Sequence, residues 1–273
     1  MKGLSVAIVC KNNAHTIARV LDACRPLIEH GGEIVALDSG STDTTLDLLA
    51  DHHARVIATP WLGHVATKQK ALDAAQREWV LCLDSDEPPD TDLQRAILDA
   101  LDRDDPRVGG YRVNRKVWYR GRYLQHAWQP EPRLRLVRKG KARWAGDDPH
   151  DRLELTDPAL RVDDLPGTLR HESFATFAEH LAKQAAHARV GAQSMHSAGR
   201  RTNAWRLTTS PIGAFLKQIV AKGAWRDGYA GWLAAGSTAA GTLMKHMILL
   251  ELQNAPPSPG RPPDPPPPAE SHP

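Results

Sequence analysis

Short apolar runs and amphipathic segments alternate along the first hundred residues. Four runs rich in β-branched residues are typical of buried strands: 4–10, 33–38, 54–60 and 79–84. Four segments with apolar residues at helical spacing follow them in turn: 13–24, 43–53, 68–76 and 90–103. This alternation predicts an α/β fold with a mostly parallel sheet and helices on both of its faces.

The pattern changes after residue 107. Two strand-like stretches without intervening helices, 110–124 and 133–144, predict an added region of mixed sheet. Beyond them, apolar spacing predicts three helices, at 174–197, 209–222 and 226–252. We therefore expect a catalytic domain over 1–170, a helical C-terminal extension over 171–254, and a proline-rich tail over 255–273 that forms no core.

Composition limits the possible partners and the compartment. The net charge of +3 over 273 residues gives no reason to expect nucleic-acid binding. The charge is uneven, however: 107–148 holds twelve Lys or Arg against three acids, which suits an anionic partner or a solvated strand face. Three cysteines without metal-type spacing, and no signal peptide or spanning apolar stretch, predict a cytoplasmic protein.

The strand expected at 79–84 ends directly on acids. Asp84 and Asp86 are two residues apart at the carboxyl end of a parallel strand, the edge where open α/β sheets bind ligands. Carboxylates held side by side repel one another, and a divalent cation such as Mg²⁺ or Mn²⁺ removes that repulsion. The alternative is an ordinary acidic helix N-terminus before Pro88.

Two further polar segments are candidates for chemistry. Asp38 ends the strand expected at 33–38 and would accept hydrogen bonds from a nucleobase or a ribose. The segment Gly146 to Asp151 carries three carboxylates and a histidine beside a proline, which indicates either a catalytic loop or a polar surface loop.

Taken together, these segments resemble family 2 glycosyltransferases of the GT-A fold. The resemblance is carried by VAIVCKNNAHTIARVLDAC (6–24), EIVALDSGSTDTTLDLL (33–49) and GHVATKQKALDAAQREWVLCLDSDE (63–87). It implies that Asp38 contacts uracil and that Lys68 faces the nucleotide. The residues that it assigns to nucleotide binding are Cys10, Asn12, Asp38, Lys68, Asp84 and Ser85. The residues that it assigns to the metal are Asp86, Asp84 and His150.

A narrower resemblance covers the later part of the chain. RLRLVRKGKARWAGDDPHDRLEL (133–155) and AFLKQIVAKGAWRDGYAG (214–231) are similar to segments of glucosyltransferases of lipopolysaccharide core assembly. This implies inverting transfer from a UDP-sugar to a saccharide or lipid-linked acceptor, with a catalytic base that is either Asp151 or Asp148. The donor sugar, the acceptor and the linkage are left open.

Two other functions fit part of the pattern. Phosphatases of the haloacid dehalogenase type also carry D-x-D after an apolar strand and a later G-D-x-x-x-D, with Asp84 then acting as a nucleophile. Their D-x-D usually follows the first strand of the fold, however, whereas three expected strands precede it here. A non-catalytic sugar-nucleotide binder would keep Asp38 and would not need the metal carboxylate or the base.

The helical extension predicts a second property. The segment 209–222 has one apolar face, and Lys217, Lys222, Trp225 and Arg226 are placed to lie at headgroup level beside it. We expect peripheral binding to the cytoplasmic face of the inner membrane, where a lipid-linked acceptor would be met. The alternative is that these helices pack on one another or on a second copy of the chain.

Overall fold

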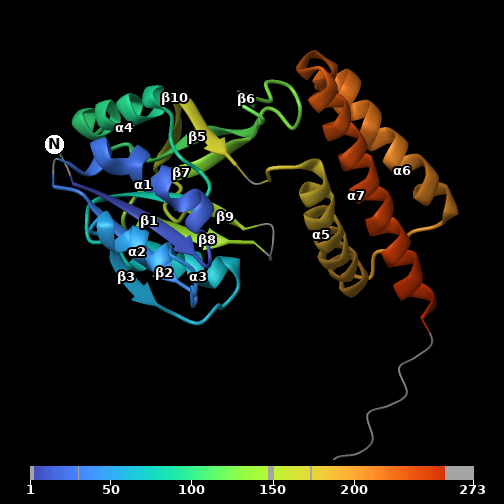
Figure 1. Cartoon of the computed structure of the whole chain (residues 1–273), viewed down its shortest axis with the longest axis horizontal. Coiled ribbons are helices and arrows are strands. Elements are labelled where there is room, and N and C mark those ends of the chain that lie inside the picture. The colour runs from blue at the N-terminus through green and yellow to red at the C-terminus, as the bar shows by residue number, and fades with distance from the viewer. Residues whose placement is uncertain (1–2, 30, 147–150, 173, 256–273) are drawn as a thin grey trace, which may run out of the picture.

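The computed structural model describes residues 3–29, 31–146, 151–172 and 174–255, and the predicted tail lies outside these ranges except for its first residue. Figure 1 shows a sheet domain beside a layer of long helices. The predicted boundary at 170–171 falls where the last strand of the sheet ends.

The sheet domain begins with four strand–helix units, as the alternating pattern predicts. Its first four strands are β1 (Leu4–Cys10), β2 (Glu33–Asp38), β3 (Arg55–Ala58) and β4 (Trp79–Asp84). The helices after them are α1 (Ala14–Ile28), α2 (Thr45–Asp51), α3 (His64–Ala74) and α4 (Thr91–Arg103). Both faces of β1, β2 and β4 are buried, which is why these strands are apolar throughout.

The second half of the domain completes a mixed sheet. It contributes β5 (Val108–Tyr119), β6 (Arg122–Tyr123), β7 (Pro132–Arg138), β8 (Ala142–Ala145), β9 (Arg152–Leu155) and β10 (Arg161–His171). The order across the main sheet is β10-β5-β7-β4-β1-β2-β3, with β7 antiparallel to both neighbours, and β8 and β9 form a separate hairpin.

The strand register brings the acidic strand ends together. Cys10 of β1 pairs with Asp38 of β2, and Val9 of β1 pairs with Asp84 of β4. Asp38 and Asp84 therefore flank the end of the same central strand, as expected for neighbouring parallel strands.

The helical extension consists of α5 (Phe177–Ser197), α6 (Ala204–Leu216), the π-helical turn η1 (Lys217–Ala221), the 3₁₀ turn η2 (Ala224–Asp227) and α7 (Tyr229–Asn254). Figure 1 shows α7 between α5 and α6. Two predicted boundaries were wrong. The helix placed at 209–222 begins at Ala204, where the Asn203 side chain accepts a hydrogen bond from the Arg206 N–H. The helix placed at 226–252 is interrupted at Gly228, whose φ is +64°.

A hydrophobic cluster joins the extension to the sheet domain. Val117 and Tyr119 of β5, Leu124 of the following loop, and Phe174 pack with small residues of α7, among them Ala230. Such small side chains let the elements approach closely.

In the described part of the chain, no helix is long and apolar enough to cross a membrane.

Candidate active site at the carboxyl ends of the strands

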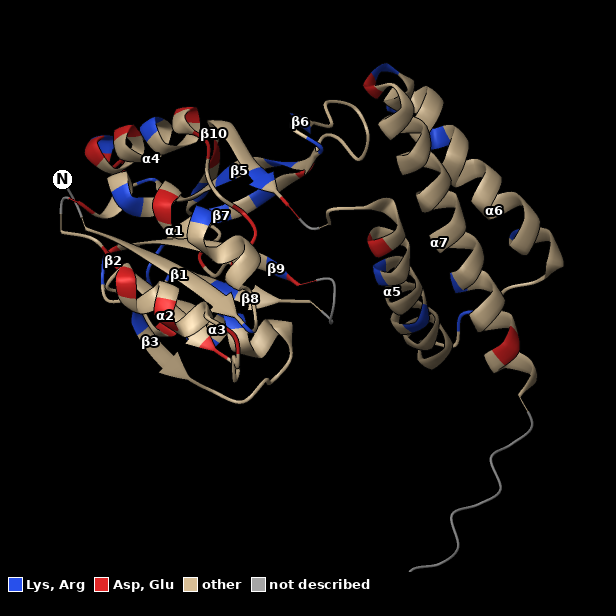
Figure 2. Cartoon of the chain, viewed as in Figure 1, with Lys and Arg blue, Asp and Glu red and all other residues tan. Residues whose placement is uncertain are grey.

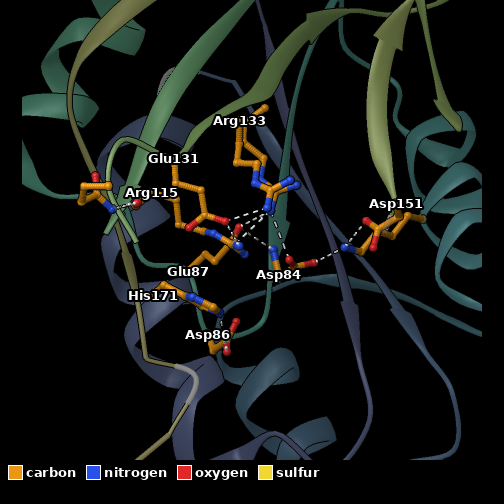
Figure 3. Close-up of polar contacts among 11 residues, drawn as sticks. Asp84, Asp86, Glu87, Arg115, Glu131, Arg133, Asp151 and His171 are labelled. Carbon is orange, nitrogen blue, oxygen red and sulfur yellow. Dashed lines mark hydrogen bonds and ion pairs between the residues drawn. The ribbon is translucent and has the colours of Figure 1, made fainter. Parts of the chain in front are cut away.

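Asp84, the last residue of β4, is held by two cations (Figure 3). Lys68 Nζ lies 2.7 Å from its Oδ1, and Arg135 Nη2 lies 3.1 Å from its Oδ2. Burial alone would raise the pKa of Asp84, but the two cations outweigh it and hold that pKa well below its usual range. Asp84 is therefore ionised, and both of its oxygens are already paired.

Glu87 anchors the turn that follows β4. Its side chain is 0 % exposed, and its carboxylate pairs with Arg135 at 2.8 Å and Arg115 at 2.9 Å. Arg115 also pairs with Glu131. The pKa of Glu87 is lowered because Arg135 and Arg115 outweigh the effect of burial. This buried network fixes the backbone on which the second acid of the motif stands.

Asp86 stands apart from that network and faces His171, the last residue of β10 (Figure 3). Its Oδ2 lies 3.6 Å from His171 Nε2. The pKa of Asp86 is raised, chiefly by burial and further by the negative charges of Glu87 and Asp84, although His171 opposes the shift. Among the described residues, none is a hydrogen-bond partner of the buried Nδ1 of His171.

This pair of side chains suits a divalent cation. Mg²⁺ binds oxygen ligands at about 2.1 Å, and Mn²⁺ accepts carboxylate and imidazole ligands, so one ion could bridge two ligand atoms up to roughly 4 Å apart. Burial raises the pKa of Asp86 in spite of the opposing charge of His171, and a bound cation would favour the ionised carboxylate. Among the described residues, no group of three or more His, Cys, Asp or Glu is placed to hold a metal ion by itself.

The predicted nucleotide residues at the other strand end organise the β2–α2 loop. Asp38 Oδ2 accepts the Gly40 N–H at 2.9 Å and the Ser41 N–H at 3.0 Å. Asn12 Oδ1 accepts the Thr42 N–H at 2.7 Å and so ties this loop to the end of β1. These contacts hold the rim beside Asp84 in one conformation.

Cys10, Lys68 and Ser85, three of the other predicted nucleotide residues, are buried. The side chain of Cys10 packs in the core, with Sγ 3.8 Å from Asp38 Oδ1, and burial followed by the Asp38 charge raises the pKa of its thiol to about 12. That thiol is therefore unavailable to a ligand. Ser85 is 9 % exposed.

Asp151 reaches the same site from the end of the segment 146–151. Its Oδ2 accepts a hydrogen bond from Lys68 Nζ at 2.8 Å, so one ammonium joins the candidate base to Asp84. The rival base Asp148 and the predicted metal ligand His150 lie outside the described residues.

A cavity of about 740 Å³ lies between the strand ends and the helical extension. Lys68, Asp84, Asp86, Asp151 and His171 line it on the sheet side. Helix α5, the turn η1 and Lys222 line the opposite side. The cavity is large enough for a nucleotide sugar and part of an acceptor.

The loop at 124–130 forms part of the cavity wall through Trp128, and Asp227 holds it in place. The Asp227 carboxylate accepts the backbone N–H groups of Gln125, His126 and Ala127 at 2.8–3.0 Å. In the sequence, the only signal at Asp227 is that its segment, 214–231, resembles glucosyltransferases of lipopolysaccharide core assembly. Its structural role depends on a contact about one hundred residues distant, which no local pattern indicates.

His171, Arg135 and Glu87 were also missed as site residues by sequence reasoning. His171 is the last residue of an irregular strand and belongs to no motif. Arg135 lies in a strand with several basic residues, and Glu87 lies in an acidic turn. Neither residue type is unusual in its segment. The one local feature of Glu87 is that it is a third acid directly after the D-x-D, which by itself does not assign it a role.

Residues 5–153 match the family Glycosyl transferase family 2. The lipopolysaccharide core biosynthesis glycosyltransferase LpsC of Rhizobium meliloti is 29% identical over 239 residues, covering 85% of this chain and 86% of the relative. An uncharacterised glycosyltransferase of Rickettsia prowazekii, RP128, is 27% identical over 241 residues, covering 85% of this chain and 82% of the relative.

Among solved structures, the mannosyltransferase PcManGT from Pyrobaculum calidifontis, in complex with GDP-Man and Mn²⁺, has a TM-score of 0.54 at 16% identity. The match covers 90% of this chain and 86% of that one, and it shows a shared GT-A fold. The family match removes the phosphohydrolase alternative. With its mixed, mostly parallel sheet and acidic strand ends, the chain belongs to glycosyl transferase family 2 and is a glycosyltransferase of the GT-A fold.

Proposed function

We propose that the protein transfers a hexose from a UDP-sugar, with inversion, to a saccharide or lipid-linked acceptor such as lipopolysaccharide core. The facing pair Asp86 and His171, at the carboxyl end of β4 and on the same cavity as Asp151, is the observation that carries this proposal. The name of the Rhizobium meliloti relative supports the acceptor class.

The residues of the site have separate roles in this proposal. Asp86 and His171 would hold Mg²⁺ or Mn²⁺, and the chemistry that such a cation would supply is stabilisation of negative charge on the leaving UDP. Asp38 and the loop that it organises receive the uridine, and Asp84 positions Lys68 toward the donor. The predicted metal role of Asp84 is less well supported than that of Asp86, because both oxygens of Asp84 are already paired with cations.

Asp151 acts as the base, and Asp148 remains the alternative. The Asp151 carboxylate takes the proton of the acceptor hydroxyl while the hydroxyl oxygen bonds to the anomeric carbon. The bond from the anomeric carbon to UDP breaks in the same step. One displacement of this kind inverts the anomeric centre. The ion pair between Lys68 and Asp151 orients the base before the acceptor arrives.

Two isosteric substitutions separate the metal site from the base. Asp86→Asn should abolish turnover and weaken UDP binding in the presence of Mn²⁺, because the neutral amide would hold the cation less tightly than the carboxylate. Asp151→Asn should leave UDP and Mn²⁺ binding nearly intact while turnover falls by roughly 10²- to 10⁴-fold. Binding is measured by calorimetry and turnover by UDP release.

The outcomes distinguish the candidates clearly. If Asp86→Asn binds UDP in saturating Mn²⁺ as well as the parent does, Asp86 is not a metal ligand. If Asp148→Asn rather than Asp151→Asn loses turnover selectively, Asp148 is the base.

The membrane role is the second part of the proposal, and an exposed apolar surface supports it. Trp205, Ile212 and Leu216 recur along one face of α6, and Val220 continues that face into η1. Trp205 is 75 % exposed and Val220 is 70 % exposed, and α6 has no buried residue. Figure 2 shows few charged residues on α6 and α7 compared with the sheet domain. This surface suits insertion into an anionic bilayer at headgroup depth.

Lys222, one of the residues predicted to lie at headgroup level, makes a contact inside the protein instead. Lys222 is half-buried and points to the loop at 124–130, where its Nζ donates to the Gln129 carbonyl at 2.6 Å. Lys217, Trp225 and Arg226 are exposed.

Flotation with anionic vesicles at low salt tests the surface. Trp205→Ser should reduce binding without affecting UDP affinity, and a parent protein that ignores the vesicles would refute the membrane role.

A further inference from the structure

A tryptophan in a strained backbone conformation lines the cavity. Trp128, in the loop at 124–130, has a φ of +60°, and its half-buried side chain forms part of the cavity wall. A bulky residue rarely adopts a positive φ, because its Cβ then crowds the following carbonyl oxygen. Such a conformation persists only where the surrounding contacts hold it, and it is concentrated at sites that bind or react.

The helical extension supplies the contacts that hold Trp128. Its backbone N–H donates to Gln218 Oε1 of η1 at 3.2 Å, and its indole Nε1–H donates to Thr238 Oγ1 of α7 at 3.0 Å. Asp227 accepts the backbone N–H groups of the three preceding residues. Gln218 and Asp227 are each 7 % exposed, so buried polar groups of the extension are committed to this one loop. Both the backbone and the ring of Trp128 are therefore fixed.

These bonds decide what the indole can offer a ligand. Because Thr238 already accepts the Nε1–H, the ring presents its π surface to the cavity rather than a donor. Phe174 and His180 support the ring, with ring centroids 6.4 Å and 5.3 Å from that of Trp128, and both also line the cavity. The face of an aromatic ring is partly negative, and the C–H groups on the face of a pyranose are partly positive. A sugar ring therefore suits this surface.

Hydrogen-bonding side chains lie beside the aromatic surface. Gln184 of α5 and Gln218 of η1 line the helical side of the cavity. Each amide has two N–H donors and an acceptor oxygen, which match the hydroxyl groups around the edge of a pyranose. A hydrocarbon chain would instead remove water from these amides without replacing its hydrogen bonds. The combination of an aromatic face and amides favours a sugar over a lipid chain.

The aromatic surface lies away from the strand end that receives the uridine. Asp38 ends β2, whereas the loop at 124–130 leads into β7, and β4 and β1 lie between these two strands. Three inter-strand spacings of about 4.8 Å therefore separate β7 from β2. Since β7 is antiparallel to β4, it begins at the edge of the sheet where β4 ends. A donor that lies between Asp38 and Asp86 leaves the region of Trp128 to the acceptor.

We propose that Trp128 is an acceptor-binding residue, and that the acceptor presents to it a pyranose ring that stacks on the indole. This inference rests on the proposed function and narrows it, because the part of the acceptor held in the cavity is then a sugar and not a lipid. Stacking against a fixed surface limits the directions in which the hydroxyl groups can point toward Asp151. Trp128 transfers no proton, so its loss should weaken acceptor binding and leave UDP binding unchanged.

The test is saturation-transfer NMR on protein first saturated with UDP and Mg²⁺, which is diamagnetic. The probes are the methyl glycosides of glucose, mannose and galactose, with 1-hexanol as a lipid-like control. We expect at least one glycoside to receive saturation mainly at the C–H protons of one ring face. Trp128→Leu should weaken the binding of that glycoside roughly ten-fold, while the UDP affinity measured by calorimetry stays the same.

Two further variants assign the effect to the aromatic face. Trp128→Phe keeps a ring without the indole N–H and should retain most of the glycoside affinity. Trp205→Leu is the matched control, since Trp205 is an exposed tryptophan of α6 that does not line the cavity, and it should change neither affinity. Melting curves check folding. If Trp128→Leu does not fold, the ring-face pattern in the parent and the affinity of Trp128→Phe decide the question.

Five results would overturn the inference. They are no saturation of any glycoside, saturation spread evenly over both ring faces, equal glycoside binding by Trp128→Leu and the parent, Trp128-dependent saturation of 1-hexanol in place of the glycosides, and a loss of UDP affinity in Trp128→Leu. The last would place the nucleotide against the ring. Failure of the parent protein to bind UDP would instead refute the proposed function itself, and that titration comes first.

Discussion

The sheet domain and the helical extension meet at one cavity but are stabilised in opposite ways. At the strand ends, charges are buried and paired: the Glu87 side chain is 0 % exposed and that of Arg135 is 6 % exposed. In the extension, small residues of α7 such as Ala230 and Gly231 are buried, while Trp205, Trp225 and Trp232 are exposed. The first arrangement fixes individual side chains for chemistry. The second relies on close backbone approach and leaves its large apolar side chains free for a partner.

The strongest test of this contrast removes a buried charge from the sheet domain. Glu87→Gln keeps the shape but leaves Arg115 and Arg135 with less compensating charge, and breaking a buried pair of this kind costs about 3–5 kcal/mol. Chemical denaturation should show that loss. Glu78→Gln is the control, because Glu78 pairs with Arg138 while 43 % exposed and should lose less than about 1 kcal/mol. Equal losses would mean that burial of the charges is unimportant.

The next test crowds the backbone contact in the extension. A Cβ added at Gly231 would lie 1.7 Å from the Ala224 carbonyl oxygen, so Gly231→Ala should force η2 and α7 apart and cost about 3 kcal/mol. Gly236→Ala is a matched control on the same helix, since a Cβ there meets nothing within 4 Å. The control should be neutral or stabilising by up to about 1 kcal/mol. Thermal melting of both variants measures the difference.

A smaller effect is expected at the contact between the two regions. Asp227→Asn replaces one acceptor oxygen with an amide that cannot accept the N–H groups of residues 125–127. We expect a loss of about 1–3 kcal/mol and a higher KM for the acceptor, because the loop carrying Trp128 loosens. Asp164→Asn, at an exposed pair with Arg112, should change neither. An unchanged melting temperature for Asp227→Asn would show that this clamp does not stabilise the contact.

The smallest expected effect is a pH dependence inside the extension. The pKa of His180 is lowered from 6.5 to about 4 in the folded chain, so the unfolded state binds more protons between these values. Stability should therefore fall as the pH drops from about 6.5 toward 4. His180→Gln removes that contribution, and its melting temperature should fall less over this window than that of the parent. Parallel curves would show that His180 is not a buried neutral imidazole.

The sequence alone predicted much of the sheet domain. Apolar runs buried on both faces placed β1, β2 and β4 at their observed bounds, because complete burial demands continuous hydrophobicity. The same pattern placed Asp38 and Asp84 at strand ends, and parallel pairing on either side of β1 then requires them to share one rim. In the extension, helix existence was predicted correctly, but the starts of α6 and α7 were not. The Asn203 cap and the break at Gly228 have weak local signals.

Only the tertiary structure decided which charges act together. Asp84 and Asp86 look equivalent in the sequence, yet one is neutralised by Lys68 and Arg135 while the other faces His171. Those partners lie between 16 and 85 residues away in the chain, and the pairing depends on how β7, α3 and β10 are arranged around β4. Hydrophobic periodicity is a local property that specifies elements and their buried faces. Electrostatic pairing depends on distance in space, and so it is determined only when the chain has folded.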